Sequence, residues 1–580
     1  MSPTIRKALP VAILLAGLVA CQNSTEQKSQ KDATQYTDPV PVVLSSPQEL
    51  EEVTVSAARV MPAYAGAERK RVMYDSIMLA KPMPEIPPSI FEQNSENYRG
   101  PADNPIRLVS EQPLSTFSVD VDTASYANIR RMILQDGNLP PLEAVRVEEM
   151  INYFHYDYPK PSSEDQPFNI DTELSTSPWN NDKYLMRIGL QAYEPDMQQR
   201  PSANLVFLVD VSGSMQSKNK LPLLKKSLLM LLDNLAAQDK VSLVVYAGAA
   251  GLVLPATAAS EKAKIRSAIN GLEAGGSTHG SAGIKLAYEQ AQQAFIEGGI
   301  NRVLIASDGD MNVGVTNIDQ LKTLIERKRK SGIALTTLGF GTGNYNDALM
   351  EELADVGNGN AAYIDSLKEA YKVLIHQMNA TLHTIASDVK IQVEFNPDQV
   401  SEYRLVGYEN RILNREDFNN DKVDAGDIGM GHQVTAIYEL SLKGEGSLPE
   451  LRYGQDGYKD ASRRDLSKKR PKAVRSDELA YIKLRYKAKQ GDASRLIEKI
   501  VNTDQLAIPF KQASDEHRFA VSVAELGQRL RGGKNLSEGN MQELIMQLRN
   551  SKGSDKFSYR GELINIAEIA ASIDQQIALQ

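Results

Sequence analysis

The chain has 580 residues, of which 42% are hydrophobic and 24% charged, with a formal net charge of −9. This composition is ordinary for soluble globular domains, and the length allows several of them. Nucleic-acid-binding surfaces are usually basic, whereas here acidic and basic residues are interspersed and the net charge is negative. We therefore expect no nucleic-acid partner.

Residues 1–21 have the pattern of a lipoprotein signal peptide. Arg6 and Lys7 precede an apolar stretch that is shorter than the roughly 20 residues of a membrane-spanning helix. The stretch ends in Leu-Val-Ala-Cys, which resembles the lipobox of bacterial lipoproteins, where the cysteine is lipidated. Cys21 is the only cysteine, so no disulfide can form within the chain. An ordinary cleaved signal with an incidental cysteine is the alternative.

The lipobox implies a cell-envelope protein that is anchored to a membrane by lipid. Gln22 follows the cysteine, in place of the aspartate that signals inner-membrane retention in enterobacterial lipoproteins. We therefore expect the outer membrane, with the protein facing either the periplasm or the outside.

Residues 22–104 are predicted to form a disordered tether. They are polar and rich in Pro, Ser and Glu, and such a segment buries too little apolar surface to offset the entropy lost on ordering. Within the tether, residues 50–60 resemble the segment that opens many TonB-dependent receptors. We interpret it as a spacer or a transient strand, and a contact with TonB is the alternative.

Two regions of mixed structure flank the centre of the chain. Residues 105–203 combine helical spacing with two alternating, strand-like runs at 168–177 and 183–193, which predicts an α+β region. Residues 379–580 begin with strand-like runs and end in helical patterns. They predict a β-rich layer followed by a C-terminal helical region.

The central region, residues 204–378, alternates between strand and helix patterns. Short runs that are apolar on both faces, as buried parallel strands are, alternate with amphipathic segments of helical spacing. The predicted strands are 204–210, 240–248, 301–309, 332–341 and 360–366, and the predicted helices are 221–238, 260–272, 281–298, 317–332 and 346–357. This alternation is typical of an α/β fold with a doubly wound, mostly parallel sheet.

Oxygen-bearing side chains gather where the first of these strands ends. Asp210, Ser212 and Ser214 are separated by one residue each, so their oxygens can converge in a strand-to-turn segment. Oxygen ligands suit Mg²⁺, Mn²⁺ or Ca²⁺ better than zinc. A divalent cation would also compensate the cost of collecting these polar groups at the end of a buried strand.

Two later motifs complete the pattern, Thr278 in a GGST loop and Asp308 in an SDG turn. In a doubly wound sheet, ligands bind beyond the carboxyl ends of the strands, where these motifs lie. Together with the DVSGS motif they resemble the von Willebrand factor type A (VWA) family and its metal-ion-dependent adhesion site.

The resemblance implies a function of binding rather than catalysis. Hydroxyls of Ser212, Ser214 and Thr278 would coordinate the cation, while Asp210 and Asp308 would act mostly through bound water. An open position on the cation would take a carboxylate from a protein partner. Residues 115–154, 404–440 and 519–533 also resemble the flanking regions of a family of bacterial VWA lipoproteins, whose C-terminal domain has no known function.

Two other functions remain open at this point. A metal-dependent hydrolase could use the same cation to activate water, although it needs a nucleophile or a general base. No two of the six histidines have the spacing that is typical of metal ligands. They are His155, His279, His376, His383, His432 and His517. A structural scaffold with an idle metal site is the other alternative. We identify no catalytic residue and expect no enzyme activity.

Three weaker signals are interpreted as structural. Residues 120–125 imitate the metal motif with Asp122 in place of a serine, and we expect Thr123 and Ser125 to cap a helix instead. Residues 417–428 start like an EF-hand loop but lack its glycine and its final glutamate, which predicts a hairpin loop. Residues 339–344 predict a tight strand-to-helix turn rather than a nucleotide site.

Overall fold

The computed structural model describes residues 96–579 except 99, 101, 120–121, 164, 195–200, 248–249, 276–279, 310–317, 378–382, 422, 424, 449–476, 490 and 506–507. These described residues belong to one compact unit, Ile86–Gln580. Cys21, the lipobox and residues 50–60 lie outside them. No helix in the part of the chain that is described has the length and apolar character needed to cross a membrane.

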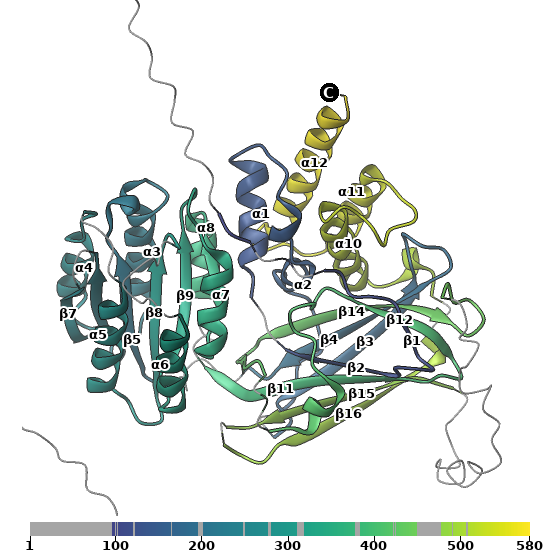
Figure 1. Ribbon diagram of the computed structural model, residues 1–580, viewed down its shortest axis with the longest axis horizontal. Coiled ribbons are helices and arrows are strands. Elements are labelled where there is room, and N and C mark those ends of the chain that lie inside the picture. The colour runs from purple at the N-terminus through teal and green to yellow at the C-terminus, as the bar shows by residue number, and fades with distance from the viewer. Residues whose placement is uncertain are drawn as a thin grey trace, which may run out of the picture. The chain divides into compact units, whose positions relative to one another are not determined.

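The central region forms a six-stranded sheet with the strand order β10-β9-β8-β5-β6-β7 (Figure 1). All neighbouring strands are parallel except the edge pair of β6 and β7. The strands are β5 (Ala203–Asp210), β6 (Lys240–Tyr246), β7 (Ala250–Ala258), β8 (Ile300–Ser307), β9 (Ala334–Phe340) and β10 (Ala361–Ile364). The predicted doubly wound, mostly parallel α/β fold is confirmed.

Helices cover both faces of this sheet because its inner strands are apolar on both sides. On β5, Leu205 and Phe207 pack with one set of helices, whereas Val206 and Leu208 pack with the other. The first set is α3 (Leu221–Asn234), α4 (Lys262–Asn270) and α8 (Leu367–Tyr371), and the second is α5 (Gly280–Gln293), α6 (Ile318–Lys330) and α7 (Asp347–Val356).

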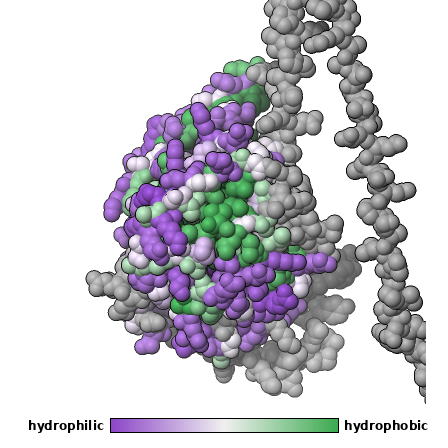
Figure 2. Space-filling model, turned by 90° about the vertical axis from the view of Figure 1, so that its left-hand side faces the viewer, coloured by the Kyte–Doolittle hydropathy of each residue, from purple (hydrophilic) through white to green (hydrophobic). Residues whose placement is uncertain are grey.

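The edge of the sheet at β7 is more apolar than a solvent-facing strand usually is. Leu252 and Val253 on this strand are 42% and 41% exposed. Figure 2, which faces this side of the molecule, shows apolar side chains gathered among hydrophilic ones. On the opposite edge of the sheet, α1 contacts β10.

The two flanking regions fold together into a β-sandwich with a shared apolar core. One sheet has the order β1-β12-β14-β4-β3, and the other has the order β13-β11-β15-β16 with β2 paired to β11. The first sheet consists of β1 (Arg107–Leu108), β3 (Phe168–Thr176), β4 (Tyr184–Ala192), β12 (Val400–Val406) and β14 (Gln433–Leu442). The second consists of β2 (Leu114–Ser118), β11 (Thr384–Phe395), β13 (Ile428–Gly429), β15 (Glu478–Lys487) and β16 (Arg495–Asn502). The VWA-like region is therefore inserted into a domain that both flanks build.

Helices from both flanks pack on the outer face of the first sheet. Leu185 of β4 and Ile437 of β14 share a buried cluster with these helices. They are α1 (Ala124–Leu134), α2 (Val147–Asn152), α10 (Asp515–Leu530), α11 (Met541–Asn550) and α12 (Tyr559–Ala578). The expected β-rich layer and C-terminal helical region are confirmed.

The predicted tether is too long at its C-terminal end. Glu96 forms an ion pair with Arg131 at 2.8 Å, and the Asn104 side chain donates to the carbonyl oxygen of Gly407 at 2.7 Å. These residues are polar, which made them look like tether, but buried partners from distant segments hold them in the folded unit.

The expectation of capping side chains at residues 120–125 is wrong. Helix α1 does start after Thr123, but the Thr123 side chain makes no capping hydrogen bond. Ser125 Oγ instead donates to the carbonyl oxygen of Ala144 at 2.6 Å. Asp122 accepts a hydrogen bond from the backbone N–H of Ala361 at 2.8 Å, which connects it to β10.

Residues 417–428 and 339–344, the two other motifs that we interpreted as structural, form a connecting segment and a turn in the fold. Asp417 and Asn414 form a capping box at the start of a short 3-10 helix, and Asp421 forms an ion pair with Arg485 at 2.7 Å. Residues 341–346 connect β9 to α7 as a strand-to-helix turn.

Candidate metal centre

The candidate site begins at the carboxyl end of β5, a central strand whose eight residues are all buried. Asp210 is the last residue of this strand, and its side chain is fully buried. The chain then turns into a short 3-10 helix, Gly213–Gln216, with Ser212 in extended conformation before it. This turn brings Ser212 Oγ and Ser214 Oγ to 2.9 Å from each other.

The neighbouring strand β8 supplies the second carboxylate. Ser307, the last residue of β8, donates its hydroxyl to Asp210 Oδ2 at 3.2 Å, and the fully buried Asp308 follows it. Gly309 closes the turn with a φ of +88°, and a Cβ there would clash with the backbone of Tyr345 and Asn346. A glycine is therefore required where the SDG turn meets the turn between β9 and α7.

The environment of Asp210 disfavours its own charge. Burial raises the pKa of Asp210 to about 6, and the nearby charge of Asp308 adds to this rise. Hydrogen bonds from Ser212 oppose it, including a donation from the backbone N–H to Asp210 Oδ1 at 2.9 Å. A divalent cation would resolve this conflict because it stabilises both carboxylates at once.

The donor set fits a hard cation. It combines two buried carboxylates with two adjacent hydroxyls, one of which, on Ser214, is exposed. No group of three or more His, Cys, Asp or Glu that could hold a metal occurs in the described ranges. A site with two carboxylates and several hydroxyls would not form such a group.

The structure brings together four of the predicted site residues, Asp210, Ser212, Ser214 and Asp308. Thr278 and its neighbour His279 lie outside the described residues. The described residue closest before them, Gly275, donates its backbone N–H to the carbonyl oxygen of Val211 at 2.8 Å.

Sequence reasoning missed Lys220. Its ammonium lies 3.0 Å from Asp308 Oδ2, and its side chain is only 8% exposed. The residue stands six positions after Ser214, directly before α3. A lone lysine before a helix is usually exposed to solvent. The sequence therefore contains no signal that Lys220 belongs to the candidate site.

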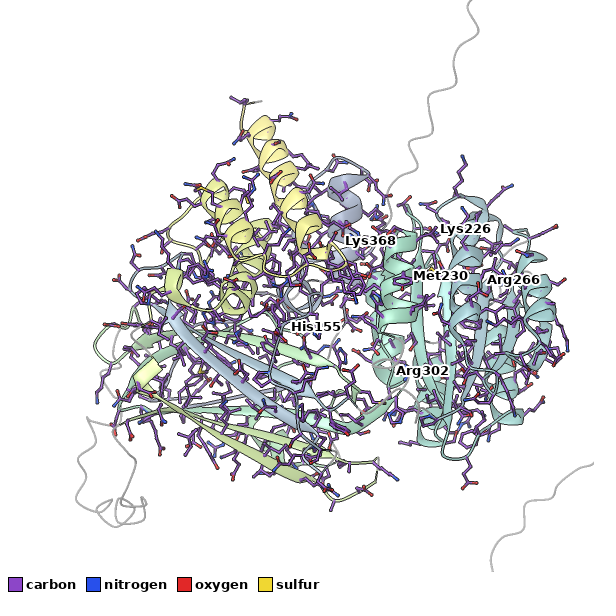
Figure 3. All side chains as sticks on the ribbon, turned by 180° about the vertical axis from the view of Figure 1, so that it is seen from behind. His155, Lys226, Met230, Arg266, Arg302 and Lys368 are labelled. Carbon is purple, nitrogen blue, oxygen red and sulfur yellow. The ribbon has the colours of Figure 1, made fainter. Side chains whose placement is uncertain are left out.

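Two hollows lie near the VWA-like region. One, of about 560 Å³, adjoins the DVSGS turn and is lined by Met215, Gln216, Leu221 and Leu272 among others. The other, of about 520 Å³, lies between this region and the sandwich and includes Arg302, whose position Figure 3 labels. Burial lowers the pKa of Arg302 to about 10. The second hollow shares no residue with the metal centre.

Comparisons with known proteins agree with this architecture. The family model of the von Willebrand factor type A domain matches residues 204–381. A model described as von Willebrand factor matches residues 92–187, and a model described as the C-terminal part of the uncharacterized protein YfbK matches residues 380–573.

Individual relatives cover the chain to different extents. The uncharacterized protein YfbK of Escherichia coli K12 is 44% identical over 491 residues, which are 83% of this chain and 82% of that protein. The uncharacterized protein sll0103 of a Synechocystis strain is 29% identical over 202 residues, 35% of this chain and 46% of that protein. A solved structure, von Willebrand factor type A from Catenulispora acidiphila, is 13% identical with a TM-score of 0.38 and covers 69% of this chain and 89% of that one. The chain therefore belongs to the family of VWA-domain proteins that includes YfbK.

Proposed function

We propose that this protein is a lipid-anchored envelope protein whose VWA domain binds a carboxylate of a protein partner through a divalent cation. The observation that supports it most is the convergence of Asp210, Ser212, Ser214 and Asp308 at the carboxyl edge of the sheet. VWA domains commonly mediate protein–protein interactions, which agrees with this proposal.

The site residues have separate roles in this proposal. The hydroxyls of Ser212 and Ser214, with Thr278, would hold a Mg²⁺ ion, for which Mn²⁺ or Ca²⁺ could substitute. Asp210 and Asp308 would stabilise its charge, mostly through bound water. The bound cation supplies a Lewis-acidic position for a carboxylate, and no bond is broken.

The surroundings suit a protein surface as partner. Ser214 is exposed beside the hollow that Met215 and Leu272 line. A partner could therefore bury apolar surface next to its metal-bound carboxylate, which is how protein interfaces gain affinity beyond a single polar contact.

Thermal unfolding with and without Mg²⁺ tests the metal centre. Mg²⁺ should raise the melting temperature of the wild-type chain relative to EDTA, and Asp210→Ala should remove this shift. Asp233→Ala is the matched control because Asp233 is 54% exposed on α3. An equal Mg²⁺ shift in Asp210→Ala would refute the site.

Capture of partners from envelope extracts tests the binding role. Wild-type protein should retain a protein in Mg²⁺ and release it in EDTA, and Asp210→Ala should retain none. Retention that chelation does not change would favour a structural scaffold. Turnover of phosphoester or peptide substrates that Asp308→Ala abolishes would favour a hydrolase.

The anchor is tested at Cys21. Cys21→Ser should prevent incorporation of a labelled palmitate analogue and move the protein from the outer-membrane fraction to the soluble one. Unchanged labelling and fractionation would refute the lipid anchor.

A further inference from the structure

Lys220 places a positive charge inside the candidate metal centre. Its ammonium is 3.0 Å from Asp308 Oδ2 and 3.2 Å from Asn344 Oδ1. Both ends of the ion pair are buried, since the side chain of Lys220 is 8% exposed and that of Asp308 is fully buried. A buried ion pair of this kind requires close compensation, because each charge has lost its water.

The lysine is held in place along its whole length. Its backbone N–H donates to the carbonyl oxygen of Ser217, and its own carbonyl oxygen accepts from Leu224 in the first turn of α3. The aliphatic part of the side chain runs against Gly341, where a Cβ would clash with the Lys220 side chain. Gly341 has a φ of +78°, a conformation that favours glycine. Because glycine has no side chain, the turn between β9 and α7 leaves room for the side chain of Lys220.

The ammonium and a divalent cation would depend on the same carboxylate. Asp308 is one of two carboxylates that would stabilise the metal, and two cations close to one acid repel each other at low dielectric. A lysine fixed to the adjacent turn is always present at high effective concentration. It therefore lowers the affinity of the site for any cation from solution.

We propose that Lys220 is a tethered counterion that competes with the divalent cation for Asp308. This inference rests on the proposed metal centre and adds a residue that sets its affinity. In the metal-free protein, Lys220 compensates Asp308. When the metal binds, the contact between Lys220 and Asp308 weakens, and so does the contact with Asn344.

The turn that contains Asn344 connects this exchange to the start of the folded unit. Gly343 donates its backbone N–H to Glu96 Oε1 at 3.0 Å, and Asn97 donates its own to the carbonyl oxygen of Tyr345 at 3.0 Å. Release of Lys220 from Asn344 removes one of the contacts that hold this turn. Metal binding should therefore loosen residues 341–346 and the segment at 96–97.

Calorimetric titration of the full chain with Mn²⁺ and Mg²⁺ tests the competition. Lys220→Met keeps much of the aliphatic stem and removes the charge, and it should bind both ions at least tenfold more tightly than the wild type. The matched control is Lys226→Met, an exposed lysine on α3 that Figure 3 labels, which should stay within twofold of the wild type. Lys220→Gln carries the same expectation and replaces Lys220→Met if that variant does not fold.

Amide hydrogen exchange gives a second readout that a purely structural lysine would not change. Mn²⁺ should speed exchange at residues 341–346 and at Asn97 in the wild type. In Lys220→Met these amides should already exchange fast, and Mn²⁺ should change them little.

The outcomes separate this inference from the proposed function. Equal or weaker metal binding by Lys220→Met, while Asp210→Ala binds none, overturns the counterion role and leaves the metal centre standing. No metal binding by the wild type and by Lys220→Met overturns both.

Discussion

Buried carboxylates are compensated in two different ways in this protein. At the junction between the VWA domain and the helices of the sandwich domain, arginines form ion pairs with the buried carboxylates. Arg146 forms an ion pair with Asp347 at 2.6 Å and another with Glu149. At the candidate metal centre, Asp210 accepts hydrogen bonds from the backbone N–H of Ser212 and from the Ser307 hydroxyl.

The difference separates a structural contact from a candidate binding site. A guanidinium offers a rigid fork that satisfies carboxylates permanently. Hydroxyls and a single ammonium leave a carboxylate pair able to accept a further cation. The junction therefore contributes to stability and orientation, whereas the candidate metal centre keeps an unfavourable burial of charge that a bound cation would relieve.

The same substitution should have opposite effects in the two regions, and the larger effect is expected at the junction. Asp347→Asn leaves the fully buried Arg146 with a weaker partner set, so we expect a loss of about 3 kcal/mol in the free energy of unfolding. Urea unfolding measures it, with Asp233→Asn as the exposed control. A loss no larger than that of the control would contradict the structural role of the junction.

His517 is a different kind of buried titratable group, a base whose ring nitrogen faces a hydroxyl. Its Nε2 lies 2.9 Å from Ser175 Oγ. Burial lowers the pKa of His517 to about 3, with Arg187 lowering it further and Glu173 opposing. The folded state therefore keeps this ring neutral while the unfolded state protonates it below its ordinary pKa.

Stability should thus fall as the pH decreases from about 6.5 toward 3, by up to about 1.4 kcal/mol per pH unit from this group. His517→Gln should remove most of that slope in urea unfolding between about pH 6.5 and 5. Parallel slopes for the variant and the wild type would show that His517 is protonated in the folded state.

Asp210→Asn should stabilise the metal-free protein, in contrast to Asp347→Asn. The amide keeps an acceptor for the Ser212 N–H and can donate to Ser307, and it removes a charge that burial disfavours. We expect a gain of about 1 kcal/mol in EDTA together with loss of the Mg²⁺ response. A clear loss of stability in EDTA would mean that the charge of Asp210 is already compensated in the metal-free protein, just as the charge of Asp347 is.

Ser214→Ala should have the smallest effect on stability. The side chain is exposed, and its hydroxyl contacts Ser212 Oγ, so the free energy of unfolding in EDTA should change by less than about 0.5 kcal/mol. Metal affinity should still fall, because a proposed ligand is lost. Calorimetry and urea unfolding of the same preparation separate the two quantities.

Much of the VWA fold and its site could be predicted because the information is local. Each parallel strand of the central sheet is a short apolar run, and Asp210 and Asp308 lie at the ends of two such runs. Parallel strands end at the same edge, so motifs that are far apart in the sequence meet there without any further information.

The structure of the two flanking regions was harder to predict because their strands pair with strands that are distant in the sequence. β14 lies between β4 and β12, strands from opposite sides of the VWA domain. Alternating patterns predicted β3 and β4 but not their neighbours in the sheet, since many antiparallel pairings bury the same faces. The end of the tether was misjudged for the same reason, because the partner of Glu96 is Arg131 on α1.

By itself, the sequence determined the alternation of strands and helices, the family and the oxygen-bearing side chains at the end of β5. These depend on hydrophobic period and motif order, which are properties of neighbouring residues. Only the tertiary structure decided that Lys220 lies against Asp308 and that arginines meet the carboxylates of the junction. Charges find their partners through the fold, because the free energy of a buried charge depends on the groups that surround it in space.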